Sequence, residues 1–237
     1  MDEFSAYAEE MRRQAQATLS AHEPELARAV YEQVLERALT EQGFEPLRAL
    51  AARIASGVIA RFLEAGKHAE ADHVWKSVER LAGDSAAPDT RGALGLCASN
   101  ALMGRLLKGE TARARDAFAV LARIAERKPR IDELDTLLTE AAVRLVVVWL
   151  QVRSPSEAYD FYILLRRAAE RHPEDPAMRR SRAKACLLLA VAFSHGGDPN
   201  FARSLASEAA GLVAEAPDDP ELVQVRERLD RAFPSRG

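Results

Sequence analysis

The chain has 237 residues, of which 48% are hydrophobic and 29% are charged, so it holds enough apolar material for a folded core and is not an intrinsically disordered sequence. The 33 Lys and Arg residues nearly balance 36 Asp and Glu residues, and this disfavours a nucleic-acid-binding protein, which usually carries a basic excess. The longest apolar run, residues 185–193, is about half of the roughly 18 residues that suggest a membrane helix, so we expect a cytoplasmic protein with no membrane partner.

Strong helix formers (Ala, Leu, Arg and Glu) dominate the chain, and short breaks divide it into segments of helical length. The pattern predicts an all-α protein. In chain order, the expected helices cover residues 3–20, 23–41, 46–65, 68–83, 88–108, 110–128, 131–152, 155–172, 176–195, 199–215 and 220–233.

Several of these breaks carry a recognisable helix start. Asp175, Asp198 and Asp219 are each followed by proline, which predicts an aspartate N-cap with proline at the first helical position. Ser154 is also followed by proline, and Glu157 stands three residues after it, which predicts a capping box.

A repeat of about 44 residues runs through the chain. Alanines recur near the start of every second helix at intervals of 44, 43, 44 and 44 residues, namely at Ala27, Ala71, Ala114, Ala158 and Ala202. Four residues after each alanine stands a large aromatic residue, or alanine in the last repeat: Tyr31, Trp75, Phe118, Tyr162 and Ala206. A third set, nine residues before the next alanine, comprises Phe62, Arg105, Trp149 and Phe193. A small and a large residue four apart share one helix face, which indicates a close helix crossing beside a filled space.

The alanine–aromatic pairs, together with turns at Gly66, Gly109 and Gly197-Asp198, resemble the tetratricopeptide repeat (TPR) family. The unit is about ten residues longer than that family's 34, and the Trp and Leu-Gly signature of its first helix is absent. The resemblance implies a right-handed solenoid of five antiparallel helix pairs plus a C-terminal capping helix. We expect one domain over residues 1–237, with repeats at 3–41, 46–83, 88–128, 131–172 and 176–215 and a cap helix at 220–233.

The resemblance also implies that the first helix of each pair lines a concave face where a ligand binds. On these helices an apolar stripe recurs at i, i+4 and i+7 spacing, and polar residues flank it. The predicted partner-binding residues are Arg53, Ser99, Asn100, Met103, Leu106, Val143, Val147, Leu150, Gln151, Lys184, Leu187 and Val191. Asn100 is of special interest because a side-chain amide can hold a peptide backbone.

An apolar stripe of this kind does not by itself establish a groove. Long inner helices in a tightly curved array would bury it as core, and a terminal helix or a second copy of the chain would cover it equally well. The sequence leaves these alternatives open.

No pattern points to catalysis. The five histidines share no metal-binding spacing, and Cys97 and Cys186 lie in apolar helical segments where buried thiols are expected. The arginine-rich segment 166–184 is interleaved with acids, which predicts a solvated surface of salt bridges. We therefore expect no enzyme activity, no cofactor and no metal.

The function predicted from the sequence is that of an adaptor or scaffold that binds a helix or peptide of another protein in an apolar concave groove. Two alternatives remain. One is a sensor for peptides or small molecules, as extended arrays of this kind are in bacterial signalling proteins. The other is a homo-oligomeric structural protein, with a homodimer as its simplest form.

Overall fold

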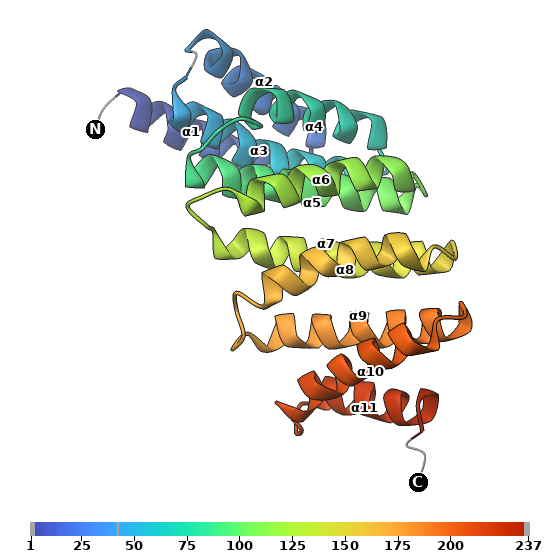
Figure 1. The fold of residues 1–237 in the computed structure, drawn as a ribbon. Coiled ribbons are helices and arrows are strands. Elements are labelled where there is room, and N and C mark those ends of the chain that lie inside the picture. Colours follow the sequence, from blue (N-terminus) through green and yellow to red (C-terminus); the bar gives the residue numbers. More distant parts are fainter. Residues whose placement is uncertain (1–2, 42, 235–237) are drawn as a thin grey trace. The chain divides into compact units, whose positions relative to one another are not determined.

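The computed structural model describes residues 3–41 and 43–234, and within them the chain forms eleven α-helices and no strand (Figure 1). The helices are α1 (Glu3–Ser20), α2 (Pro24–Thr40), α3 (Glu45–Glu64), α4 (His68–Ala82), α5 (Pro88–Leu107), α6 (Thr111–Glu126), α7 (Asp132–Gln151), α8 (Pro155–Ala169), α9 (Pro176–His195), α10 (Pro199–Ala214) and α11 (Pro220–Ala232). Every end lies within three residues of the sequence prediction, and the all-α repeat fold is confirmed.

The helices group into two compact units, residues 1–137 and 138–237, and the division falls inside α7. The first unit holds α1 to α6 and the first turns of α7. The second unit holds the rest of α7 and α8 to α11. That the whole chain forms one cooperative domain over residues 1–237 stays a prediction.

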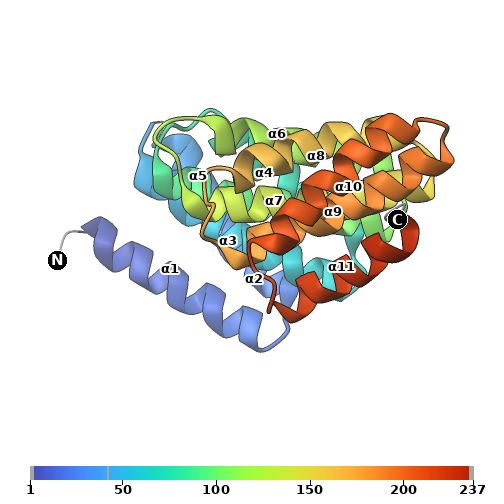
Figure 2. The same cartoon turned by 60° about the horizontal axis from the view of Figure 1, so that its bottom comes forward.

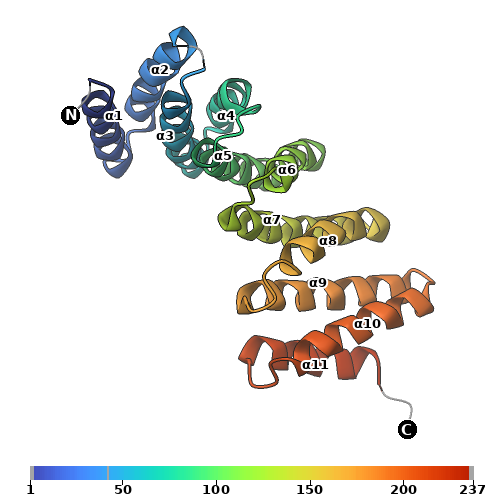
Figure 3. The ribbon, with the colours of Figure 1, turned by 60° about the vertical axis from the view of Figure 1, so that its left-hand side comes forward.

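In the first unit each odd-numbered helix forms a hairpin with the even-numbered helix that follows it. Successive odd helices also pack on one another, α1 against α3 and α3 against α5, and α2 contacts α4 in the same way (Figure 3). The odd helices thus form one layer and the even helices a second. Side chains on the exposed side of the odd layer are available to a ligand.

In the second unit α9 is the central helix. It packs against α8, α10 and α11, and α10 also contacts α11 (Figure 2). Most of the middle of α9 is therefore covered, including Cys186 and Leu189, which are fully buried.

The alanine and aromatic sets occupy the positions that the repeat predicts, since all ten residues are buried. The aromatic hydroxyls also join even helices to one another. Tyr31 of α2 lies 2.7 Å from the Ser77 hydroxyl of α4, and Tyr162 of α8 donates to Glu208 of α10 at 2.6 Å. Because the same contact joins the same pair of positions in two repeats, it belongs to the repeat unit rather than to one turn of the chain.

One backbone conformation recurs at the turn inside each helix pair. The second residue after the first helix has a positive φ in all five repeats: His22 (60°), Gly66 (71°), Gly109 (73°), Arg153 (60°) and Gly197 (90°). In each case the next residue's N–H donates to a carbonyl five residues back, as in Lys67 to Phe62 at 2.7 Å and Ser154 to Trp149 at 2.9 Å. This is the Schellman ending of a helix, which requires the left-handed region at that point.

The predicted N-caps at Asp175, Asp198 and Asp219 are confirmed, since each side chain accepts one or two backbone N–H groups of the first helical turn. The prediction of a capping box at Ser154 is wrong. Its backbone N–H already donates to the Trp149 carbonyl, so Glu157 binds elsewhere, accepting from the Ser154 hydroxyl at 2.7 Å and from the Trp149 indole N–H at 2.8 Å.

Candidate partner-binding surface

A large apolar hollow lies on the odd-helix layer of the first unit. Its volume is about 630 Å³, and α3, α5 and residues 131–137 line it. Leu96, which is 46% exposed, lies in it beside Ala93, Gly92 and the half-buried Leu137. Gly92 has open space where a side chain would stand, so the floor at that point is backbone. An uncovered leucine in a hollow of this size is the kind of feature that marks an interaction site.

A second hollow, of about 330 Å³, adjoins the first and extends between α1, α3 and α5. Arg53 and Asp89 line both hollows, and they form an ion pair with an Nη2–Oδ2 distance of 3.0 Å. Arg53, one of the predicted binding residues, therefore stands where the two hollows meet. The Arg53 side chain is 47% exposed and that of Asp89 is 78% exposed, so their ion pair contributes little to stability.

A buried arginine holds one wall of the larger hollow in place. Arg91 of α5 is fully buried, and burial lowers the pKa of its guanidinium. It donates three hydrogen bonds of 2.7–2.8 Å to the backbone carbonyls of Ile124, Arg127 and Pro129. These bonds fix the segment that leads into Ile131, a wall residue. A wall held in this way is formed before any ligand arrives, which lowers the entropy lost on binding.

The predicted stripe on α5 continues beyond the hollow. Ser99, Asn100, Met103 and Leu106 are each half-buried. The Asn100 amide donates to the Ser56 carbonyl of α3 at 3.0 Å, so this group links two inner helices.

In the second unit, four predicted residues come together. A hollow of about 210 Å³ is lined by Val143 and Val147 of α7 and by Lys184 and Leu187 of α9, and α11 borders it as well. Val147 is 37% exposed, whereas Leu187 is buried and forms part of the floor. From α11 the hollow receives Gln224, Val225 and Arg228.

A further hollow of about 270 Å³ follows along α9 and α11. Val191, another predicted residue, lines it together with Ser194, His195, Arg231 and Phe233. Arg228 lines both this hollow and the preceding one, so the two adjoin along α11. We call them together the α9–α11 groove.

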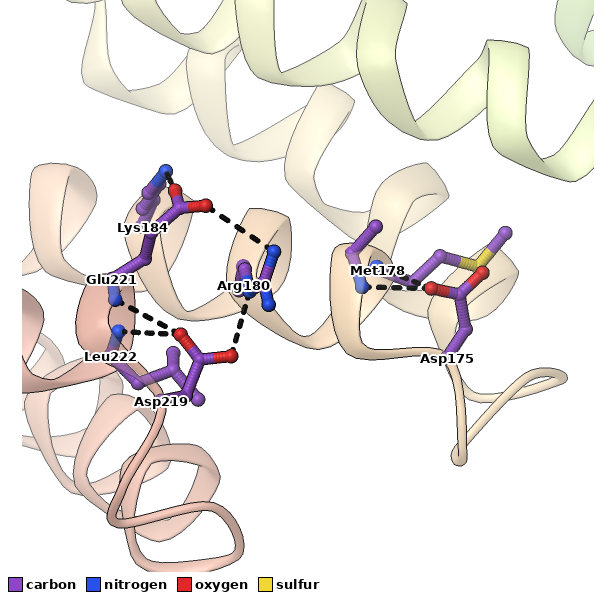
Figure 4. Close-up of polar contacts among 8 residues, drawn as sticks. Asp175, Met178, Arg180, Lys184, Asp219, Glu221 and Leu222 are labelled. Atoms are coloured by element: carbon purple, nitrogen blue, oxygen red, sulfur yellow. Dashed lines mark hydrogen bonds and ion pairs between the residues drawn. The ribbon is translucent and has the colours of Figure 1, made fainter.

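Ion pairs fix the start of α11 against α9 (Figure 4). Arg180 donates to Asp219 at 2.7 Å and to Glu221 at 3.3 Å, and the Lys184 ammonium also pairs with Glu221. The hydrogen bond from Arg180 lowers the pKa of Asp219, and that from Lys184 lowers the pKa of Glu221. Asp219 is also the N-cap of α11, so the same carboxylate caps this helix and holds it against α9.

Six predicted residues line none of these hollows. They are the half-buried Ser99, Asn100, Met103, Leu106 and Leu150, and Gln151, which is exposed at the end of α7. Sequence reasoning missed Leu96, although it lies one turn before Asn100 on the same face. It also treated α11 only as a cap. The buried Leu222, Val225 and Leu229 fit that role, but Arg228, the residue before Leu229, lines the groove.

The described residues hold no cluster of three or more His, Cys, Asp or Glu side chains placed to bind a metal. Both cysteines are buried, and burial raises the pKa of Cys186 to about 12, so its thiol is a poor nucleophile. Within residues 3–41 and 43–234, no helix is long and apolar enough to cross a membrane.

The comparisons with known proteins fit this architecture. No family model and no curated protein matches the chain. Among solved structures, the chain is similar to a Podospora anserina putative kinesin light chain with nearly identical TPR-like repeats, with a TM-score of 0.51 and 15% identity over 92% of this chain and 100% of the other. It is also similar to BtubC (BKLC) from P. vanneervenii, with a TM-score of 0.46 and 14% identity over 92% of this chain and 94% of the other. The similarity at a TM-score of 0.51, together with the eleven described helices, shows a TPR-like helical-repeat fold.

Proposed function

We propose that the protein is a non-enzymatic scaffold or adaptor that binds a helix or peptide of a partner protein along its odd-numbered helices. The observation that carries this proposal is the larger hollow of the first unit, with Leu96 exposed in it. Proteins with TPR-like folds are typically scaffolds for protein interactions, which supports the same conclusion without naming a partner.

The lining of this hollow favours a protein segment over a small molecule. A sensor pocket needs several polar groups that converge on one ligand. Here Arg53 and Asp89 are paired with each other, and the other two polar side chains of the lining, Glu133 and Thr136, are exposed. The remaining lining is apolar or glycine: Pro88, Gly92, Ala93, Leu96, Ile131 and Leu137. Such a surface suits a row of apolar side chains from a helix laid in a groove. The two buried free thiols are typical of a reducing compartment, and the setting we propose is the cytoplasm.

The experiment is site-specific photo-cross-linking in lysate of the source cell. A photoreactive phenylalanine analogue replaces Leu96 in one sample and Leu26 in another. Leu26 is a matched control because it is a similarly exposed leucine (53%) on α2, outside the hollow. We expect a defined adduct from position 96 that is absent from position 26 and is lost when Met103 or Leu137 is replaced by Asp. Circular dichroism verifies that each variant is folded.

Two results would change the proposal. Equal adducts from both positions would mean that the hollow is not a preferred binding site. An adduct at twice the mass of the chain, formed by the purified protein alone, would replace the scaffold by a homo-oligomer.

A further inference from the structure

The charge around the α9–α11 groove is strongly one-sided. Its two hollows are lined by four basic side chains, Lys184, His195, Arg228 and Arg231, and by one acidic side chain, Glu221. Glu221 is already paired with Lys184 and Arg180 through its two carboxylate oxygens. Among the described residues that line the groove, no carboxylate is therefore left to balance the remaining cations.

Arg228 and Arg231 are the two arginines of the groove that are available to bind an anionic group. Both are exposed, and neither makes an ion pair or a side-chain hydrogen bond within the described part of the chain. They lie three residues apart on one face of α11, so both guanidinium groups border the same strip of surface. In contrast, Arg180 and Arg182 of α9 are each occupied by carboxylates.

The strip between these cations is apolar. Val143, Val147 and Leu188 lie at one end, and Val191 and Phe233 at the other. This apolar strip can contact the apolar side chains of a bound segment. The unpaired guanidinium groups at its edge can bind carboxylates that flank those side chains. Guanidinium binds carboxylate through paired hydrogen bonds, which gives such a segment a preferred orientation.

We infer that the α9–α11 groove binds an acidic amphipathic helix of a partner protein, with its apolar side chains on Val147 and Val191 and its carboxylates on Arg228 and Arg231. This inference rests on the proposed function and adds the chemistry of the partner. It concerns the second unit alone, whereas the cross-linking at Leu96 tests the first.

The test uses the full-length protein and two fluorescein-labelled model peptides, both four-turn amphipathic helices with the same leucine face. One carries glutamate on its polar face and the other lysine. Fluorescence anisotropy measures binding at low and at physiological salt. We expect the glutamate peptide to bind, the lysine peptide to bind at least tenfold more weakly, and added salt to weaken the glutamate complex.

Matched variants separate specific recognition from general attraction. Arg228→Glu and Arg231→Glu together should weaken the glutamate peptide at least tenfold. Arg226→Glu with Arg203→Glu makes the same change in net charge at two exposed positions outside the groove and should leave binding within twofold. Val147→Asp should weaken binding as strongly as the first pair. Circular dichroism confirms that each variant keeps its helices.

Equal losses in both double variants would overturn the inference, because binding would then follow net charge alone. Equal binding of the two peptides would overturn it as well. Binding of anionic lipid vesicles without binding of either peptide would assign the cations to a membrane surface instead. If the peptides fail while the Leu96 adduct persists, the scaffold function stands and only this assignment falls.

Discussion

The Arg105 guanidinium of α5 donates to the Asp72 carboxylate of α4 at 2.5 Å and to the Arg113 carbonyl of α6 at 2.7 Å. Arg105 occupies the position that Phe62 and Trp149 fill in other repeats, and only 8% of it is exposed. One repeat therefore replaces an aromatic contact by a bridge among three helices. Arginine can occupy a position that is aromatic in other repeats because its methylene groups pack like an apolar side chain while its guanidinium group is hydrogen-bonded.

Acid should weaken this bridge. Burial acts to raise the pKa of Asp72, but hydrogen bonds from Lys76 and Arg105 outweigh it, so the pKa lies below its usual value. A lowered folded-state pKa gives stability that is present above the unfolded value of about 3.9 and is lost as the pH falls through the folded value. Asp72→Asn should cost about 1 kcal/mol at pH 7, since the site is partly solvated. Urea titrations at pH 7 and pH 3 should show this difference shrinking on acidification; a constant difference would contradict it.

Arg91→Met should destabilise the first unit by about 2–4 kcal/mol. Three backbone carbonyls lose their charged hydrogen-bond donor, and methionine does not fill the fully buried space of the guanidinium group. The change should also raise amide hydrogen exchange over residues 127–131. Arg123→Met, at an exposed position on α6, is the control and should have little effect. Unchanged exchange at 127–131 would show that these bonds do not hold the wall of the hollow.

Arg153→Gly should stabilise the protein by about 0.5–1 kcal/mol. Arg153 has a φ of 60°, which costs a non-glycine residue about 1–2 kcal/mol, and part of that gain is offset by the freedom of glycine in the unfolded chain. Gly109→Ala is the reciprocal control, since nothing crowds Gly109 and only its φ of 73° opposes a side chain. The thermal midpoint should rise in the first variant and fall in the second. Changes of the same sign would be inconsistent with a backbone cause.

The two tryptophans report on the two units separately, because Trp75 lies in the first and Trp149 in the second, both buried. α7 continues through the division, so we expect the units to unfold together as one domain. Trp75→Phe and Trp149→Phe variants leave one reporter each. Each variant's fluorescence midpoint in urea should coincide with its own circular-dichroism midpoint. Midpoints that differ within one variant would establish two domains.

Both thiols should be unreactive in the folded protein. The Cys186 thiol donates to the Tyr162 hydroxyl at 2.9 Å, and burial raises its pKa to about 12; burial also raises the pKa of Cys97. A chromogenic disulfide reagent at pH 8 should label neither cysteine until denaturant is added, and then both. Rapid labelling of the native protein would mean that α9 or α5 opens locally.

Much of the fold follows from the sequence because the helix period and the proline starts act locally, and the 44-residue spacing shows that the same helix pair recurs along the chain. The burial of Tyr31 and Trp75 could be predicted since small and large residues four apart specify a crossing. The same reasoning fails where coverage depends on which helix lies opposite. Leu187 and Val147 belong to equivalent apolar stripes, yet only Leu187 is buried.

Arg91 and Arg228 illustrate the same limit. Both are arginines on predicted helices, and periodicity alone gives them similar roles. Arg91 is fully buried, and three carbonyls of a distant turn accept its hydrogen bonds, whereas Arg228 is exposed on α11. Contacts between residues more than thirty positions apart decide such cases, and no local pattern encodes them.

The left-handed residue in each turn has a consequence for how such a chain changes length. Its position is defined by the sign of φ and by one hydrogen bond, and His22 and Arg153 occupy it as Gly66 does. Excision of residues 67–109 would join Gly66 to Glu110 and restore the same turn with the same bond. Whole units can thus be lost or duplicated at this point without a new loop, so the number of repeats is free to vary while each junction stays the same.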